Sequence, residues 1–468
     1  MKQKTMIAFS RHAFVRHFDD VSLIVNQRND AKYLLRDAEP FLRFIGRTPR
    51  TEEEIIRDIA GVYGCPPEDV AEDFRAFAES ISGALLRGET EAELAAQEPE
   101  FRYYSTEELN HLESGSLTSR EGSAEPEPDG DIAGEMAAYF QKHPAPQELH
   151  IDLTIACTER CVHCYIPEYK NRFLPFETVC RILDEYRGMN GLRVTFSGGE
   201  PMLHPQFREI LRYARKCDLM IYILSNLTVL DEKTAETLEE VGIHYLQTSV
   251  YSMIPEVHEA ITRRPGSFDE TMRGIALMRK YDVPMKINTP VMTENYESWR
   301  TVKDFAADQN YKFMSNASLT GRTNHDNSNL DHALSAEKMM CYLRNCRDCD
   351  PWSKLARKNA DEPICNILVQ NINVDSQGNY YPCDGCHGLV LGNCHEMSLE
   401  KVWNGPKAKE LRALKQKDFA ECFGCPDREF CKLCPTNNFN ETGDMFKHIP
   451  GRCELAKLKR KIYEESKC

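Results

Sequence analysis

Alternating strand and helix patterns fill the middle of the chain. Short runs of apolar residues predict six strands, at 148–155, 193–197, 220–225, 245–250, 285–289 and 312–316. Apolar residues at helical spacing follow the runs and predict helices at 177–189, 205–216, 232–241, 268–281 and 296–308. Repeated strand–helix units imply an α/β fold with a parallel sheet, either open or closed into a partial barrel of six units. In such folds ligands bind at the carboxyl ends of the strands.

A different pattern precedes this region. Alternation with a period of two predicts strands at 14–18, 21–25 and 32–35, and helical spacing predicts helices at 39–45, 52–63 and 66–86. Thr51 and Glu54 have the spacing of a capping box at the start of the second helix. Three strands with three helices are the parts of a winged-helix-like module, which we place at residues 1–87.

The predicted modules are separated by polar sequence. Residues 88–145 carry 14 acidic and 3 basic side chains and are rich in Ser, Gly and Pro, so we expect an acidic flexible linker there. The barrel domain then covers 146–334. From 335 to 468 the sequence is irregular and rich in cysteine, and we expect a separate domain that metal stabilises.

Charge and cysteine content restrict the function classes. The formal net charge of −15 argues against a general nucleic-acid binder. We find no apolar stretch long enough for a membrane helix and no secretion signal, so we expect a cytoplasmic protein that does not bind membranes. Of the 19 cysteines, 13 lie after residue 340. Because cytosolic thiols stay reduced, cysteines grouped at short spacings indicate metal binding rather than disulfides.

Three cysteines follow the first predicted barrel strand, at Cys157, Cys161 and Cys164, in the pattern C-x3-C-x2-C. Three thiolates on a 4Fe-4S cluster leave one iron without a protein ligand, and that iron can bind a small chelating molecule. The alternative is a zinc site with His163 as the fourth ligand. We disfavour it because zinc ribbons use paired knuckles rather than this triplet.

This loop resembles the signature of the radical S-adenosylmethionine (SAM) superfamily, and similar matches end the next three strands. The resemblance implies a 4Fe-4S cluster at the loop, SAM as cofactor, and an electron donor such as flavodoxin or ferredoxin. It also implies that a 5′-deoxyadenosyl radical removes a hydrogen atom from the substrate. Taken singly, each further match is weak, and Arg263 alone would be a solvated surface charge. The SAM-binding residues that the resemblance implies are Ser197, Gly198, Gly199, Glu200, Ser225, Asn226, Ser249 and Arg263.

A second cysteine array follows the barrel and resembles the SPASM domain, the auxiliary iron–sulfur module of peptide-modifying radical SAM enzymes. The resemblance implies two auxiliary 4Fe-4S clusters, an outer one and an inner one. The fourth ligand of the inner cluster stays open between Cys341, Cys346, Cys349, Cys386 and a thiolate of the substrate. The competing interpretation is a pair of structural zinc sites. The implied ligands are Cys422, Cys425, Cys431 and Cys453 for the outer cluster, and Cys365, Cys383 and Cys434 for the inner one.

Two local features accompany this array. The sequence around Gly378 predicts a hairpin that would bring Cys365 and Cys383 together. Asp384 directly follows Cys383, and in anaerobic sulfatase-maturating relatives an aspartate in that place acts as a base, so the resemblance implies a catalytic role for Asp384. A turn-forming role before Gly385 is an equally good interpretation.

The N-terminal module resembles the PqqD-like precursor-recognition domain of peptide-maturation enzymes, which binds a leader peptide as an added strand. A DNA-binding winged helix is the competing interpretation, but 13 basic and 14 acidic residues in 1–87 leave no strong phosphate-binding surface. Together the three modules are similar to sactipeptide and ranthipeptide maturases of RiPP biosynthesis. We therefore predict an oxidoreductase that forms thioether crosslinks in a precursor peptide. The alternatives are carbon–carbon or carbon–oxygen crosslinking, side-chain oxidation, and a non-catalytic iron–sulfur redox regulator.

Overall fold

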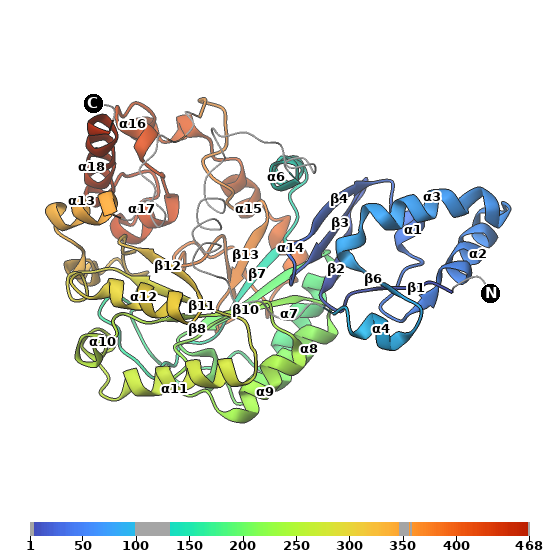
Figure 1. Ribbon diagram of the computed structural model, residues 1–468. Helices are drawn as coiled ribbons and strands as arrows, with labels where there is room; N and C mark the ends of the chain where they lie inside the picture. Colours follow the sequence, from blue (N-terminus) through green and yellow to red (C-terminus); the bar gives the residue numbers. More distant parts are fainter. Residues whose placement is uncertain (1–3, 99–131, 346–354, 356–357, 467–468) are drawn as a thin grey trace.

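The computed structural model describes residues 4–98, 132–345, 355 and 358–466. A small N-terminal domain, a strand–helix domain and a C-terminal region of short helices follow one another along the chain (Figure 1). Of the predicted flexible linker at 88–145, residues 99–131 lie outside the described residues, as do Cys346, Cys349 and Cys468, whereas its two described ends contain helices at Glu91–Ala95 and Ile132–Lys142. Within the described ranges, no helix is both long enough and apolar enough to cross a bilayer.

A nine-stranded sheet forms the centre of the molecule, in the order β12-β11-β10-β9-β8-β7-β13-β14-β15. Neighbours are parallel from β12 to β13 and antiparallel beyond it. The six predicted barrel strands are all present, each within one residue of its predicted limits. The strands are β7 (Glu148–Thr154), β8 (Arg193–Gly198), β9 (Met220–Leu224), β10 (Tyr245–Ser249), β11 (Met285–Pro290), β12 (Lys312–Asn316), β13 (Asn371–Val374), β14 (Asn379–Tyr381) and β15 (Gly392–Asn393).

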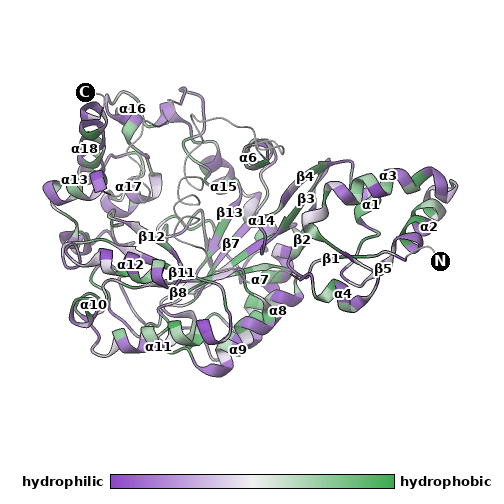
Figure 2. Cartoon of the chain, in the orientation of Figure 1, coloured by the Kyte–Doolittle hydropathy of each residue, from purple (hydrophilic) through white to green (hydrophobic). Residues whose placement is uncertain are grey.

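Helices cover one face of this sheet because each carries an apolar stripe. On α8, for example, Phe207, Ile210 and Leu211 are buried, while hydrophilic residues cover its outer side (Figure 2). These side chains share one core with alternate strand residues such as Ile151 and Val194. Sequence periodicity did not predict α10. The helices are α7 (Phe176–Gly188), α8 (Phe207–Lys216), α9 (Glu232–Val241), α10 (Pro255–Thr262), α11 (Ser267–Lys280) and α12 (Trp299–Asp308).

The predicted hairpin at Gly378 is confirmed, and it extends the barrel sheet. Gly378 has φ +83°, a conformation that favours glycine, and it lies between the antiparallel strands β13 and β14. Strand β13 pairs in parallel with β7, with Asn373 opposite His150. The C-terminal region is therefore hydrogen-bonded to the first barrel strand, and the chain that leaves β14 brings Asp384 within 3.9 Å of His150 on β7.

The N-terminal domain contains two three-stranded sheets, β5-β1-β6 and β2-β3-β4, packed on its helices. The predicted capping box is confirmed: Thr51 N donates to Glu54 Oε2 at 3.0 Å, and Glu54 N donates to Thr51 Oγ1 at 3.3 Å. The elements are β1 (Met6–Phe9), β2 (Ala13–His17), β3 (Val21–Asn26), β4 (Lys32–Arg36), α1 (Glu39–Leu42), β5 (Arg50–Thr51), α2 (Glu52–Tyr63), α3 (Pro67–Ser80), β6 (Leu85–Gly88) and α4 (Glu91–Ala95).

This domain docks against the amino ends of the barrel strands. Phe14 and Leu23 share an apolar cluster with Met220 and Tyr222 at the start of β9 and within it. The fully buried Arg16 donates to Gly191 O at 2.7 Å and pairs with Asp218 at 3.0 Å. Helix α6 (Ile132–Lys142) packs beside β4. The N-terminal domain therefore does not cover the carboxyl ends of the barrel strands, where the loop of Cys157, Cys161 and Cys164 follows β7.

Short helices make up most of the C-terminal region. The long helix α18 packs on α13, so the end of the chain closes back onto the segment that leaves the barrel (Figure 1). The helices are α13 (Ala336–Asn345), α14 (Leu399–Trp403), α15 (Pro406–Arg412), α16 (Ala420–Phe423), α17 (Pro435–Thr442) and α18 (Pro450–Glu465).

Candidate active site

The three-cysteine loop leaves β7 at the carboxyl end of the sheet and is held by the end of α10. Arg160 N donates to Thr262 O at 2.9 Å, and Val162 N donates to Ile261 O at 2.9 Å. These backbone bonds fix the loop without using its thiols. Burial raises the pKa of Cys157 to about 12, so its thiol stays protonated at neutral pH unless a metal centre binds the sulfur atom.

The end of β8 lies directly against the start of this loop. Gly199 N donates to Thr154 O and Glu200 N donates to Ala156 O, both at 2.8 Å. A Cβ atom on Gly198 would lie 2.0 Å from Thr154 O, and one on Gly199 would lie 2.1 Å from Ala156 O. Only glycine permits this approach, so the two glycines bring the polar end of β8 beside the cysteines.

Glu200 is a fully buried carboxylate at the end of β8. The Ser225 hydroxyl donates to both of its oxygens, at 2.9 and 3.0 Å, and Asn226 N donates to it at 2.8 Å. Burial raises the pKa of Glu200 to about 7, because these neutral donors offset only part of the lost hydration. A cationic amino group would stabilise this carboxylate, and the sulfonium cofactor SAM carries one.

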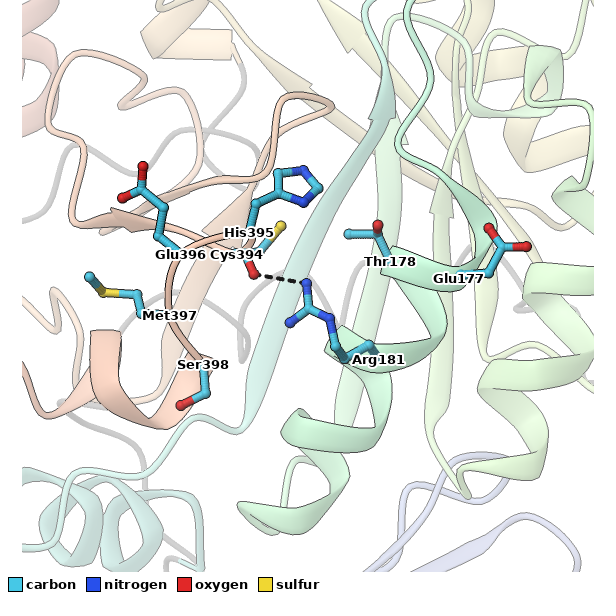
Figure 3. A pocket seen from close by; sticks show the side chains of 8 residues that line it. All are labelled: Glu177, Thr178, Arg181, Cys394, His395, Glu396, Met397 and Ser398. Atoms are coloured by element: carbon cyan, nitrogen blue, oxygen red, sulfur yellow. Dashed lines mark hydrogen bonds between the residues drawn. The ribbon is translucent and has the colours of Figure 1, made fainter.

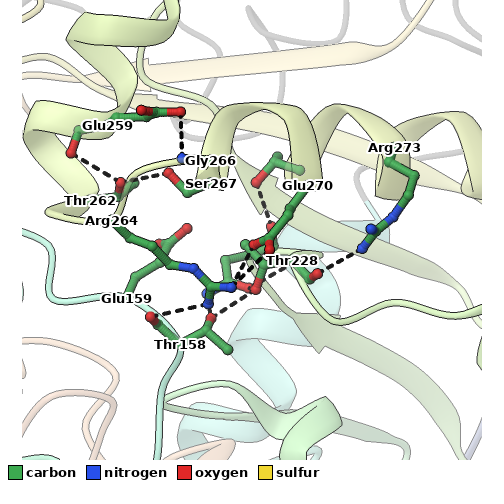
Figure 4. Close-up of polar contacts among 12 residues, drawn as sticks. Thr158, Glu159, Thr228, Glu259, Thr262, Arg264, Gly266, Ser267, Glu270 and Arg273 are labelled. Atoms are coloured by element: carbon green, nitrogen blue, oxygen red, sulfur yellow. Dashed lines mark hydrogen bonds and ion pairs between the residues drawn. The ribbon is translucent and has the colours of Figure 1, made fainter.

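A second buried carboxylate, Glu159, lies inside the loop itself. The thiol of Cys161 donates to Glu159 Oε2 at 3.3 Å, and burial raises the pKa of Glu159 to about 7. Arg264 approaches the loop from the other side: it donates to Thr158 O at 3.3 Å and pairs with Glu270 at 2.8 Å (Figure 4). Sequence motifs did not single out Glu159 or Arg264, because neither occupies a position with a required residue type.

The predicted cofactor residues do not all meet here. Ser197, Gly198, Gly199, Glu200, Ser225 and Asn226 gather around the loop. Ser249 ends β10 at the same edge of the sheet. Arg263 is exposed at the left-handed C-cap of α10, with φ +54°, and its neighbour Arg264 points to the loop instead (Figure 4). The structure does not bring Arg263 into this set.

Aromatic side chains close the far side of the loop. Tyr251 directs its hydroxyl at Cys161 Sγ over 3.7 Å, and the ring of His163 packs edge-on against Tyr251 at 5.3 Å. Burial lowers the pKa of His163 to about 4, which keeps this imidazole neutral. His163 thus packs as a neutral ring against Tyr251 beside the loop.

A chain of polar side chains joins β7 to the C-terminal region. His150 Nε2 lies 3.2 Å from Asp152 Oδ1 and 3.9 Å from Asp384 Oδ1, while His387 Nε2 lies 3.4 Å from Asp152 Oδ2. The side chain of Asp384 is 60% exposed, whereas that of Asp152 is buried. Asp384 is therefore the end of this chain that a substrate can reach. The ring of Tyr165 lies edge-on to His387, 6.3 Å away.

Eight C-terminal cysteines form two separate groups of four. Cys422 interacts electrostatically with the three other thiols of the outer group, and Cys431 interacts with two of them. Cys365 interacts with Cys383 and Cys434, and Cys386 interacts with the same two. A hollow of about 670 Å³ is lined by all four outer cysteines and by Cys365. The outer group consists of Cys422, Cys425, Cys431 and Cys453, and the inner group of Cys365, Cys383, Cys386 and Cys434.

The donor sets suit iron–sulfur clusters and SAM. In the described ranges, no three His, Cys, Asp or Glu side chains are drawn together closely enough for a single metal ion. Thiolates are the ligands that iron–sulfur clusters take, and they are supplied here as one set of three and two sets of four. The glycine cradle and the buried Glu200 beside the set of three match a cofactor with an amino group.

Comparison with known proteins identifies the same two modules. Residues 151–306 match the model of the radical SAM superfamily, and residues 365–426 match the SPASM iron–sulfur cluster-binding domain. An AdoMet-dependent heme synthase of Methanosarcina barkeri is 25% identical over 340 residues, 65% of this chain and 96% of that protein. The subtilosin biosynthesis protein AlbA of Bacillus subtilis is 25% identical over 332 residues, 67% of this chain and 72% of that protein.

One solved structure extends the likeness to the N-terminal domain. Streptococcus suis SuiB bound to precursor peptide SuiA has a TM-score of 0.57 and 16% identity, covering 93% of this chain and 97% of that chain. The fold and the site define an enzyme that holds SAM against an iron–sulfur cluster. The chain is a radical SAM enzyme with a SPASM domain, and its cofactors are SAM, a 4Fe-4S cluster at the first loop and auxiliary iron–sulfur clusters. The predicted fold class and cofactors are confirmed.

Proposed function

We propose that this enzyme forms thioether crosslinks in a ribosomally made precursor peptide. The observation that carries the proposal is the outer strand β4 of the β2-β3-β4 sheet. Among the described residues β4 pairs with β3 alone; four of its five residues are partly buried, Arg36 is exposed, and α6 packs beside the strand without pairing with it. An open strand edge of this kind binds an extended peptide through main-chain hydrogen bonds. The leader of the precursor would dock there.

The docking strand belongs to a domain that is fixed to the barrel. Arg16 and the apolar contacts of Phe14 and Leu23 hold the sheet against the barrel strands. A leader bound at β4 would keep the rest of the peptide tethered, which raises its effective concentration at the mouth of the barrel. Peptide binding and radical chemistry can then take place on domains that are in contact with each other.

The linked side chains of His150, Asp152, His387 and Asp384 offer an acceptor for the proton that the reaction releases. When bound, SAM and its cluster supply a radical that takes one hydrogen atom from a peptide carbon, and the auxiliary clusters supply a site for one electron. Forming a carbon–sulfur bond from C–H and S–H also releases one proton. We assign Asp384 as the acceptor of that proton, because its carboxylate is exposed to a substrate and lies 3.9 Å from His150.

The test is mass spectrometry of the modified peptide. The enzyme is produced together with a candidate precursor peptide that contains cysteine, and the product is alkylated. We expect the loss of two hydrogen atoms and one alkylatable thiol for each link formed. Two hydrogen atoms lost with an unchanged thiol count would contradict thioether formation and indicate a carbon–carbon or carbon–oxygen link, or side-chain oxidation.

The similarity to a heme synthase favours a second candidate, the modification of a tetrapyrrole. The match with that relative covers 65% of this chain, whereas the likeness to SuiB covers 93%. A tetrapyrrole substrate leaves the open β4 edge without a role. Turnover of an iron porphyrin carboxylate without peptide would favour this candidate, and peptide-dependent SAM cleavage would exclude it.

A further inference from the structure

The inner group of thiols contains one cysteine that the SPASM spacing does not assign. Cys383, Asp384, Gly385 and Cys386 form a tight turn in which Cys386 N donates to Cys383 O at 3.2 Å. Gly385 adopts φ +72°, a value that glycine tolerates and other residues avoid. The turn directs both thiols to the same side, into the protein, and Cys386 has no exposed surface.

The thiol of Cys386 lies among the other three thiols of the group. It is hydrogen-bonded to the thiol of Cys383, and both approach Thr436, whose Oγ1 lies 2.8 Å from Cys383 Sγ. Cys386 also interacts with Cys434, which itself interacts with Cys365. Four thiols from three separate segments are therefore linked by these interactions into one group.

Other described cysteines lie elsewhere. Cys341 is exposed on α13, and its thiol contacts Tyr296 and accepts from Asn345 at 3.4 Å. Cys394 is buried beside α7, where its carbonyl oxygen accepts from Arg181 at 2.8 Å (Figure 3). Among the residues that the structure describes, neither cysteine interacts with the inner thiols.

We propose that Cys386 is the fourth protein ligand of the inner auxiliary cluster, together with Cys365, Cys383 and Cys434. Four cysteine ligands close a 4Fe-4S cluster, and each iron then has its protein ligand. A consequence follows that rests on the proposed thioether function: the substrate thiol does not bind to this cluster and reacts without iron ligation. Asp384, inside the same turn, then lies between two cluster ligands.

The test uses full-length protein in which Cys157, Cys161 and Cys164 are replaced by Ala, so that only auxiliary clusters are loaded. In this background, Cys386→Ala is compared with Cys394→Ala, which removes a buried thiol of the same region. We expect Cys386→Ala to lose the iron of one cluster or to show the signal of a three-iron cluster by electron paramagnetic resonance. Cys394→Ala should keep the parent's iron content and spectrum.

An unchanged iron content and spectrum in Cys386→Ala would overturn the assignment, and so would the expected loss appearing in Cys341→Ala. Cys386→Ser guards against misfolding, since a serine oxygen can still bind iron. We expect it to retain iron and to shift the reduction potential of one cluster, whereas an unshifted potential would contradict the assignment. No substrate is present in these measurements, so their outcome is independent of whether the enzyme makes thioethers.

Discussion

The Nε2 atom of His150 lies 3.2 Å from Oδ1 of Asp152, and both side chains are largely buried. Burial by itself would lower the pKa of His150, but the charge of Asp384 and the hydrogen bond to Asp152 outweigh it and raise the pKa to about 9. Burial would likewise raise the pKa of Asp152, but its bonds to His150 and His387 hold it well below its usual range. The site therefore contains a stable imidazolium at neutral pH.

This imidazolium makes stability depend on pH. Because the pKa of His150 is higher in the folded protein than the unperturbed 6.5, its contribution is complete below pH 6.5 and is lost as the pH rises through 9. We expect the free energy of unfolding to fall by about 3 kcal/mol across this range on account of His150. Urea unfolding of the parent and of His150→Gln at several pH values measures it. If the free energy of unfolding changed with pH by the same amount in both proteins, the raised pKa of His150 would be contradicted.

For Glu200 the free energy of unfolding should also fall as the pH rises, but over a lower pH range. Its pKa is raised to about 7 by burial, so ionising it costs folding energy that is absent below pH 4.5 and complete above pH 7. We expect Glu200→Gln, without SAM, to gain up to about 3 kcal/mol over the parent at pH 8 and little at pH 4.5. SAM affinity should fall at least tenfold at the same time, by equilibrium dialysis. Glu236→Gln, at an exposed position of α9, is the control.

Much of the fold could be read from the sequence because the barrel strands and helices are local patterns. The predicted edges of β12 and α9 agree with the structure to the residue. The pairing of β13 with β7 could not be read in this way, since it joins Asn371 to Glu148 and depends on the tertiary fold. Short strands such as β1 were missed because four residues carry little periodicity.

The residues of the candidate site, too, could be predicted from the sequence only in part. Cysteine and glycine motifs were visible because their chemistry needs fixed spacings. His150 and Asp152 were not singled out, because alternate polar residues are ordinary in a strand with one solvated face. Their importance appears only when β14 brings Asp384 beside them. Cys386 remained one of several candidates until the turn at Gly385 placed its thiol next to that of Cys383.

Fixing the N-terminal domain to the barrel should matter for peptide turnover. Arg16→Met keeps the apolar stem but removes the buried bonds to Gly191 and Asp218; Arg47 still pairs with Asp218, so we expect a loss of about 1 to 3 kcal/mol. We expect faster limited proteolysis between the two domains and a several-fold loss of leader-dependent turnover. SAM cleavage without peptide should be unchanged. Arg212→Met, which breaks an exposed pair with Glu240 on the outer helices, should behave as the parent.

If both readouts of Arg16→Met match those of Arg212→Met, the docked arrangement does not contribute to peptide handling. Equal losses of peptide-dependent and peptide-independent SAM cleavage would instead indicate general damage to the barrel.

The central claim is that the loop of Cys157, Cys161 and Cys164 binds a cluster at which SAM is cleaved. The most direct test incubates anaerobically reconstituted enzyme with dithionite and SAM and measures 5′-deoxyadenosine by chromatography. The account predicts its release by the parent, faster release when the precursor peptide is added, and none from the protein with all three cysteines replaced by Ala. Release that survives the loss of these thiols, or a loop that holds zinc instead of iron in the parent, would contradict it.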